Sequence, residues 1–369
     1  MTTTTDLLPE GLEDRLPASA ARITGAMRAC LDAMDAHGYD RVRPPLLEFE
    51  SSLASRMNGV RTDACFRMTD PASLRTLALR SDITPQIGRI AATSLAGTPR
   101  PLRLAYAGDT ALIRASQLDP ARERLQLGAE LIGADSVAAA SEIVGLAITA
   151  LEAAGLTGIS VDFTMPDLID TLAAGDNALD ADTLEGVRRE LDTKDAGGLK
   201  AVGGEAYLPL LYATGEFADA LAALRAFDDK GVCASRLDAL SQIEAEVAPR
   251  ARITLDPTER HGFEYQSWFG FTLYADGLRG AAGRGGTYRI GGSNEPATGF
   301  TLYLDRVAEA VRQEPGAQRK VFAETGHSAA AARAARDNGD RVIARISDAD
   351  DPRALGCTHI LSGDTIAAL

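Results

Sequence analysis

An alternating pattern between residues 103 and 133 restricts the fold of this 369-residue chain more than any other feature. Two strand-like runs flank a loop, and the second run alternates apolar with polar residues: Leu125, Leu127, Ala129 and Leu131 against Gln126, Gly128 and Glu130. A period of two is typical of a strand with one buried face. The pattern therefore predicts an antiparallel hairpin whose polar face carries both Gln126 and Glu130.

Segments on either side of this hairpin predict an α+β fold with a mixed, mostly antiparallel sheet flanked by helices. The expected helices cover 18–38, 136–154 and a segment that begins near Thr84. The expected strands cover 41–50, where Pro44 and Pro45 interrupt the run, then 75–80, 158–165, 263–277 and 298–311, which passes from strand to helix.

Residues 166–250 differ in character from the rest of the chain. Ala, Leu, Asp and Glu recur there at helical spacing between glycine-rich joints, which predicts an inserted helical domain. The expected domains are a core in two parts, 1–165 and 251–318, the insertion 166–250, and a small truncated α/β segment, 319–369, with three strands and one helix.

Charge and hydropathy exclude several classes of protein. The balance of 38 Lys and Arg against 52 Asp and Glu gives a net charge of −14, which repels nucleic acid. No apolar run reaches the length of about 18 residues that a membrane span needs. The N-terminus also lacks a basic segment followed by an apolar one, so we expect a cytoplasmic protein.

Cysteines and histidines are scattered along the chain, and Cys357 with His359 is the only close pair. This spacing favours a packed thiol over a metal site. We therefore expect neither a metal nor a cofactor.

The hairpin resembles motif 2 of the class II aminoacyl-tRNA synthetases, most closely that of histidyl-tRNA synthetase. In that family a phenylalanine-arginine pair and a downstream glutamate hold ATP and the acyl phosphate. Those places are occupied here by Ala111, Leu112 and Arg114. Because an apolar side chain cannot donate charged hydrogen bonds to a phosphate, we expect adenylate formation to be absent and assign no catalytic residue.

Further segments are similar to the same family in the same order, over nearly all of residues 7 to 318: LRSDITPQ (79–86), HGFEYQSWFGFTLYA (261–275), GRGGTYRIGG (283–292) and GFTLYLDR (299–306). Taken alone, the glycines of the third segment favour a plain hairpin turn. The family arginine of the second segment falls on His261, and Thr287 and Arg289 replace the arginine and aspartate of the third.

The resemblance implies a pocket that still holds free histidine. Its expected contacts are Asp82, Thr84, Gln126, Glu130, Tyr265 and Tyr288, and possible vestigial nucleotide or phosphate contacts are Arg122 and Arg306. Taken one at a time, Asp82, Gln126, Glu130 and Tyr265 fit better a cleft in which polar groups satisfy one another and water. Their occurrence together in separate segments favours ligand binding.

The helix over 18–38 and the proline-interrupted strand RVRPPLLEFE resemble motif 1, the dimer seam of class II synthetases. This resemblance implies a homodimer. The alternative from the residues themselves is an ordinary edge strand in a monomer.

Taken together, these features resemble the regulatory subunits of ATP phosphoribosyltransferase, a histidyl-tRNA synthetase-like family. The resemblance implies a non-catalytic chain that binds and activates the short catalytic subunit within a hetero-oligomer. It also implies inhibition by histidine, the end product of the pathway. The alternatives are a divergent active histidyl-tRNA synthetase and a stand-alone histidine-binding dimer.

Overall fold

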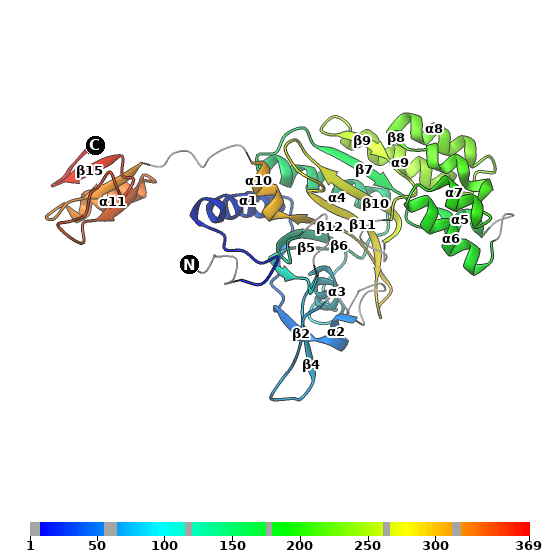
Figure 1. Cartoon of the computed structure of the whole chain (residues 1–369), viewed down its shortest axis with the longest axis horizontal. Helices are drawn as coiled ribbons and strands as arrows, with labels where there is room; N and C mark the ends of the chain where they lie inside the picture. The colour runs from blue at the N-terminus through cyan, green and yellow to red at the C-terminus, as the bar shows by residue number, and fades with distance from the viewer. Residues whose placement is uncertain (1–7, 55–64, 115–119, 175–178, 261–265, 312–318) are drawn as a thin grey trace. The chain divides into compact units, whose positions relative to one another are not determined.

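The structure, a computed structural model, describes residues 8–54, 65–114, 120–174, 179–260, 266–311 and 319–369 (Figure 1). The chain divides into two compact units, residues 1–312 and residues 313–369. Each unit has its own hydrophobic core and is described separately.

The described residues of the larger unit form a nine-stranded mixed sheet. From edge to edge the strands are β1 (Asp40–Arg41), β5 (Leu102–Ala111), β6 (Glu123–Ile132), β12 (Glu295–Tyr303), β11 (Gly283–Ile290), β10 (Gln266–Tyr274), β7 (Ser160–Thr164), β9 (Arg252–Leu255) and β8 (Gly215–Glu216). Only the β1·β5 and β7·β9 pairs are parallel among them. The predicted α+β fold with a mostly antiparallel sheet is confirmed.

One face of this sheet is covered by α1 (Pro17–Ala36), α4 (Val137–Ala153) and α10 (Leu304–Ala310) (Figure 1). Leu127, Ala129 and Leu131 point from β6 into this core. Helix α4 is apolar nearly all round because it packs on the sheet, on α1 and on α9 (Ala234–Val247) at once. Each fully buried leucine or isoleucine in this layer contributes about 1.5–3 kcal/mol of burial free energy.

The opposite face carries α3 (Thr84–Ala92), which packs on Leu104 and Tyr106 of β5 and on Ile290 of β11. Beside it lie a second, three-stranded sheet and a short helix: β2 (Leu47–Phe49), β4 (Thr76–Leu79), β3 (Arg67–Thr69) and α2 (Glu50–Ala54).

The single strand expected over 41–50 is corrected to two strands. Residues 40–41 pair with β5 in the large sheet, and residues 47–49 pair with β4 in the small one. Pro44 and Pro45 lie between them, and they have no N–H to continue either ladder.

Residues 283–290 of the GRGGTYRIGG segment form strand β11, and Gly291 and Gly292 lie in the turn that leads to β12. The hairpin turn that the glycines favoured is therefore found at the end of the segment and is wrong for the glycines within the strand. Strand β11 pairs with β10 on one side and β12 on the other. Glycine is required at 285 because a side chain there would collide with the ring of Phe271. The close approach of neighbours, rather than a turn, explains this glycine.

Helices dominate the chain between β7 and β9: α5 (Leu168–Ala173), α6 (Ala181–Asp192), α7 (Ala196–Ala201), the 3₁₀ helix η3 (Glu205–Tyr212), α8 (Phe217–Phe227) and α9. Asp180 and Asp195 cap α6 and α7 by accepting backbone N–H bonds of the first turn. The division of the core into 1–165, 166–250 and 251–318 stays a prediction.

The smaller unit contains β13 (Lys320–Ala323), α11 (Ala329–Asp337), β14 (Arg341–Ala344), β15 (His359–Ser362) and β16 (Thr365–Ala368). The described strands run in the order β14-β13-β15-β16. The sequence pattern predicts three strands here, and β16 is an additional strand that it did not indicate. Gly363 and Asp364 form the two-residue connection from β15, and Gly363 has the positive φ of 54° that such a turn requires.

Candidate functional site

Polar side chains gather on the α3 face of the large sheet, where β5, β6, β12 and β11 lie side by side. Glu130 of β6 is paired with Gly299 of β12, and Tyr106 of β5 is paired with Gly128 of β6. A Cβ at Gly299 would collide with the Glu130 carboxylate, and one at Gly128 would lie within 2.5 Å of the Tyr106 hydroxyl. These glycines provide the space in which the larger side chains stand.

Glu130 lies at the centre of this group and is 1% exposed. Tyr288 donates from its hydroxyl to Glu130 Oε2 at 2.9 Å, and Tyr106 donates to Oε1 at 3.4 Å. Burial raises the pKa of Glu130 to about 8, and the hydrogen bond from Tyr288 opposes this rise without cancelling it. The carboxyl is therefore mostly protonated at neutral pH.

Asp82, Thr84 and Gln126 hold the chain where α3 begins, and the Thr84 side chain reaches Glu130. Gln126 Oε1 accepts from the N–H of Ile83 at 3.0 Å, and Asp82 Oδ1 accepts from the N–H of Thr84 at 3.1 Å. Burial raises the pKa of Asp82, while hydrogen bonds from Thr84 act in the opposite direction. Thr84 is therefore the first residue of the helix, and its hydroxyl is directed into the site.

The structure thus brings together most of the residues predicted to hold histidine: Asp82, Thr84, Gln126, Glu130 and Tyr288. Tyr265, and with it His261, lies outside the described residues.

Sequence reasoning missed two members of this group, Tyr106 and Thr301. The Tyr106 hydroxyl lies 2.6 Å from Thr301 Oγ1 and 3.2 Å from Thr84 Oγ1. Both are buried residues of segments that resemble the family, the hairpin and GFTLYLDR, but no ligand contact was predicted for either of them. Only the register across β5, β6 and β12 reveals that they meet.

A narrow pocket opens beside these residues, lined by Thr84, Glu130, Gln266, Arg284, Gly285, Gly286, Tyr288, Gly299, Phe300 and Thr301. Its volume is about 10 Å³, which is room for about one water molecule. A larger ligand requires that lining side chains move.

The arginines predicted as vestigial phosphate contacts bond to backbone. Arg122 donates to the carbonyl oxygens of Leu112 and Glu10, both at 3.2 Å, and so connects the hairpin to the N-terminal segment. Arg306 donates to the carbonyl oxygen of Ala281 at 3.3 Å. Their assignment to phosphate stays a prediction.

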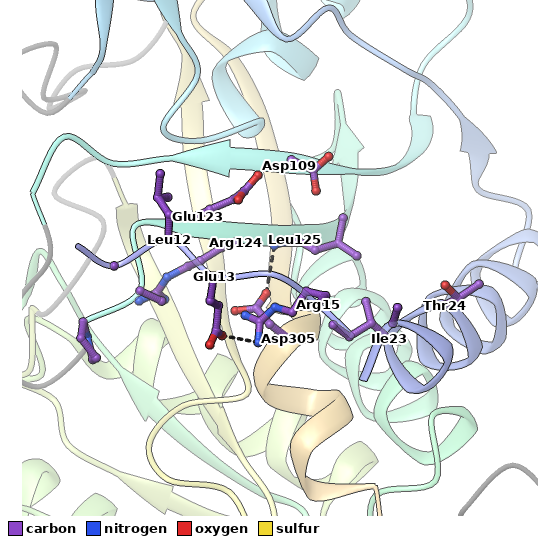
Figure 2. Close-up of a pocket in the computed structure, with 14 residues that line it drawn as sticks. Leu12, Glu13, Arg15, Ile23, Thr24, Asp109, Glu123, Arg124, Leu125 and Asp305 are labelled. Atoms are coloured by element: carbon purple, nitrogen blue, oxygen red, sulfur yellow. Dashed lines mark hydrogen bonds and ion pairs between the residues drawn. The ribbon is translucent and has the colours of Figure 1, made fainter. Parts of the chain in front are cut away.

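Two adjoining pockets, which we call the α1 groove, run beside α1 and share Asp109 and Leu125. The first, of about 480 Å³, is bounded by residues 11–15, α1, the hairpin and Asp305 of α10 (Figure 2). The second, of about 550 Å³, is lined by the segment 41–46.

Both the sequence and the fold of the chain are similar to those of known proteins. The sequence profile of histidyl-tRNA synthetase matches residues 11–307. A crystal structure described as an ATP phosphoribosyltransferase regulatory subunit/histidyl-tRNA synthetase from Bacillus halodurans superposes with a TM-score of 0.82 at 24% identity, over 96% of this chain and 97% of the other. Histidyl-tRNA synthetase from Nostoc sp. PCC 7120 gives a TM-score of 0.77 at 14% identity, over 96% and 90%. These matches define a class II, histidyl-tRNA synthetase-like protein.

Relatives of higher sequence identity indicate one particular family. The ATP phosphoribosyltransferase regulatory subunit of Rhodospirillum centenum is 40% identical over 98% of this chain and 95% of its own length. That of Paramagnetospirillum magneticum is 39% identical over 98% and 97%. The chain belongs to the family of ATP phosphoribosyltransferase regulatory subunits, and its role is regulatory rather than catalytic. Within the described residues, helices that could cross a membrane were not found.

The raised pKa of Glu130 predicts a dependence of stability on pH. Between its ordinary pKa and about 8, the native state binds a proton that the unfolded chain has released. The free energy of unfolding that the raised pKa of Glu130 contributes is therefore fully present below pH 4 to 5, and it is lost as the pH rises through about 8. We expect the wild type to lose free energy of unfolding relative to Glu130→Gln between about pH 5.5 and about pH 9, where each unit of pKa separation represents about 1.4 kcal/mol. Urea denaturation at both pH values measures this, and parallel pH profiles would contradict the buried carboxyl.

Proposed function

We propose that this chain binds free histidine in the Glu130 pocket, activates the short catalytic subunit of ATP phosphoribosyltransferase, and makes that enzyme sensitive to histidine. The observation that carries the proposal is the convergence of carboxyl, hydroxyl and amide groups from β5, β6, β11, β12 and the start of α3 around one buried position. The names of the relatives supply the partner.

The chemistry of the group suits the two ends of histidine. Glu130 is placed to accept the imidazole N–H, with Tyr288 orienting its carboxylate. Asp82, Thr84 and Gln126 offer the carboxylate, hydroxyl and amide oxygens that an ammonium group needs as acceptors. Tyr265 completes the imidazole end in this proposal.

Binding must open the pocket, because its present volume holds about one water molecule. Gln266 is well placed to move, since it lines the pocket and, among the described residues, its side chain has one hydrogen bond, from Nε2 to the carbonyl oxygen of Gly285 at 2.7 Å. The pocket then has a closed state and an open state that bind histidine with different affinity. Regulation by a ligand requires such a difference between two states.

The test of the function is reconstitution with the short catalytic chain. We expect the two proteins to co-purify, transferase turnover to rise on mixing, and added histidine to lower turnover of the complex but not of the catalytic chain alone. Calorimetry on this chain alone measures its own histidine binding. Histidine binding without any effect on the transferase would point to a stand-alone histidine-binding protein instead.

We further propose that two copies pair along the α1 groove. The first pocket carries more carboxylates than arginines, including Glu13, Glu123 and Asp305, whereas the second is edged by Arg41 and Arg43. A two-fold axis apposes the same surface of both copies, so the acidic end of one groove can meet the basic end of the other. Leu46, 48% exposed beside Arg43, supplies an apolar contact.

This pairing predicts that Leu46→Asp will shift the protein toward monomer. Symmetry places the substitution in the interface twice. Because Leu46 is 48% exposed in the single chain, each copy loses about half of the roughly 1.5–3 kcal/mol that full burial of a leucine contributes. Sedimentation velocity over a concentration series measures the shift. Leu74→Asp is the matched control, since Leu74 is also exposed, at 79%, but lies between β3 and β4. A wild type that stays monomeric at every concentration would refute the pairing.

The proposed place of action is the cytoplasm. All four cysteines are buried free thiols, which fits a reducing compartment.

A further inference from the structure

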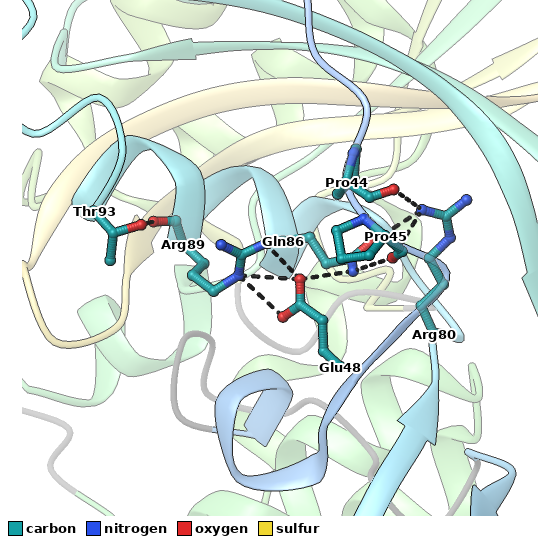
Figure 3. A network of polar contacts seen from close by, with 7 residues as sticks. All are labelled: Pro44, Pro45, Glu48, Arg80, Gln86, Arg89 and Thr93. Atoms are coloured by element: carbon teal, nitrogen blue, oxygen red, sulfur yellow. Dashed lines mark hydrogen bonds and ion pairs between the residues drawn. The ribbon is translucent and has the colours of Figure 1, made fainter. Parts of the chain in front are cut away.

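One buried arginine connects the proposed dimer surface to the proposed histidine pocket. Arg80 follows β4 and is 6% exposed. Its Nε donates to the carbonyl oxygen of Asp109 at 2.7 Å, and its Nη1 donates to that of Pro44 at 3.1 Å and to Gln86 Oε1 at 3.3 Å (Figure 3). Arg80 thus joins β5, the proline segment and α3.

The proline segment is held to α3 by further contacts of the same network. Gln86 Nε2 donates to the carbonyl oxygen of Pro45 at 2.7 Å and to Glu48 Oε1 at 2.9 Å. Arg89 Nε donates to both Glu48 oxygens at 3.0 Å (Figure 3). Residues 44–48 therefore cannot shift without moving α3 or breaking these bonds.

On its other side Arg80 adjoins the pocket residues in sequence. Ser81 follows it, and then come Asp82, Ile83 and Thr84. The N–H of Ile83 is bonded to Gln126, and Thr84 lines the pocket. Arg80 is not among the residues that line the pocket. It can therefore influence a ligand only by positioning the residues that do.

The guanidinium is needed for its shape. Its hydrogen-bond acceptors named above are backbone carbonyls and one amide, neutral groups that lie in different directions. A planar fork with donors at fixed angles reaches all of them, whereas the ammonium group of lysine does not. Gly108 leaves room for this fork, because a Cβ there would collide with the Arg80 guanidinium.

We propose that Arg80 is a positioning residue that links histidine binding to the pairing of two copies. The inference rests on the proposed function, both the pocket and the α1 groove. A second copy seated against residues 41–46 holds Pro44 and Pro45 in place. Through Arg80 and Gln86 these prolines hold the chain from Asp82 to Thr84 in its binding geometry. Paired copies then bind histidine more tightly than single ones.

Reciprocity makes this measurable, because histidine must strengthen pairing by the same factor by which pairing strengthens histidine binding. We expect the dimer dissociation constant of the wild type to fall by a factor within the usual range of about 5 to 150 when histidine saturates the protein. In Arg80→Lys this factor should fall to about one, while dimers still form.

Sedimentation velocity with and without histidine measures the factor, and calorimetry confirms saturation in each variant. Gly108→Ala is a second variant that displaces the guanidinium while keeping the arginine, and it too should lose the linkage. Arg43→Lys is the matched control. Arg43 is an exposed arginine that lines the second pocket of the α1 groove, as Arg80 does, and its replacement should keep the wild-type factor even if pairing weakens overall.

The outcomes separate this inference from the proposed function. A wild type that binds histidine and dimerises, but whose dimer constant ignores histidine, overturns the linkage and leaves the function intact. An unchanged factor in folded Arg80→Lys and Gly108→Ala also overturns it. Loss of histidine binding in a variant that remains folded supports the positioning role. No histidine binding by the wild type refutes the proposed pocket itself.

Discussion

The pure protein will show only background exchange of pyrophosphate into ATP in the presence of histidine. By the resemblance to motif 2, Leu112 falls where the synthetases carry the arginine that holds the reacting phosphate, and leucine cannot donate a hydrogen bond from its side chain. Loss of one such donor typically lowers turnover by about 10²- to 10³-fold, and Ala111 and Arg114 differ from the family as well. Radiolabelled pyrophosphate exchange measures this directly, with an active histidyl-tRNA synthetase as the positive control.

Restoring the arginine by Leu112→Arg is not expected to restore exchange, since groups that act as a unit are not rescued singly. The structure adds a reason at Thr287, which replaces another family arginine. Thr287 is 5% exposed, and its hydroxyl lies 2.8 Å from Ser267 Oγ and 3.2 Å from the carbonyl oxygen of Phe269. Thr287 is therefore packed and hydrogen-bonded between strands, where a long charged side chain such as arginine would not fit without rearrangement. Histidine-dependent exchange by the wild type would refute its regulatory role.

Glu130→Gln will weaken histidine binding by about ten- to a hundredfold, the equivalent of about 1.5–3 kcal/mol for a lost charged hydrogen bond. The amide keeps the shape of the carboxyl and can still accept from Tyr288. It has no proton to lose, whereas the carboxyl, mostly protonated in the free protein, becomes charged when an imidazolium binds beside it and lowers its pKa. Calorimetry on both proteins measures the ratio. Glu152→Gln, which removes an exposed carboxylate of α4, should bind histidine as the wild type does.

The same variant separates regulation from assembly. A complex that contains Glu130→Gln should still show raised transferase turnover but should no longer be inhibited by histidine. Alanine is the poorer choice here, because Glu130 is buried rather than exposed at a cleft. Alanine would remove the carboxyl that accepts from the Tyr288 and Tyr106 hydroxyls and would leave a cavity in its place, so stability would fall together with binding. Equal histidine affinity in wild type and Glu130→Gln would mean that the site lies elsewhere.

Local patterns predicted the elements with little error. The helix expected over 136–154 is Val137–Ala153, and Ser136 caps it by accepting the N–H of Ala139. Hydrophobic period and caps depend on neighbours in sequence, so they can be read without the fold. Strand β16 and the split of residues 41–50 were missed because both depend on which strand lies alongside.

The candidate site could be predicted only in part for the same reason. Alternation alone placed Gln126 and Glu130 on one face of a strand, and likeness to a known family contributed Asp82, Thr84 and Tyr288. Tyr106 and Thr301 carry no local signal, since each enters the site from a different strand through cross-strand pairing.

The amino-acid sequence by itself determined the hairpin with its polar face, the α+β class and the family, because each depends on residue type and spacing along the chain. The loss of the phosphate-binding arginine stays a prediction from the family resemblance. Only the tertiary structure decided that Glu130 is buried and mostly protonated at neutral pH. The registers that set Gly299 beside Glu130 and Gly128 beside Tyr106 bring three strands together there. The pKa of Glu130 depends on all the groups that surround it in the folded chain, so it cannot be predicted from the residues that are its neighbours in sequence.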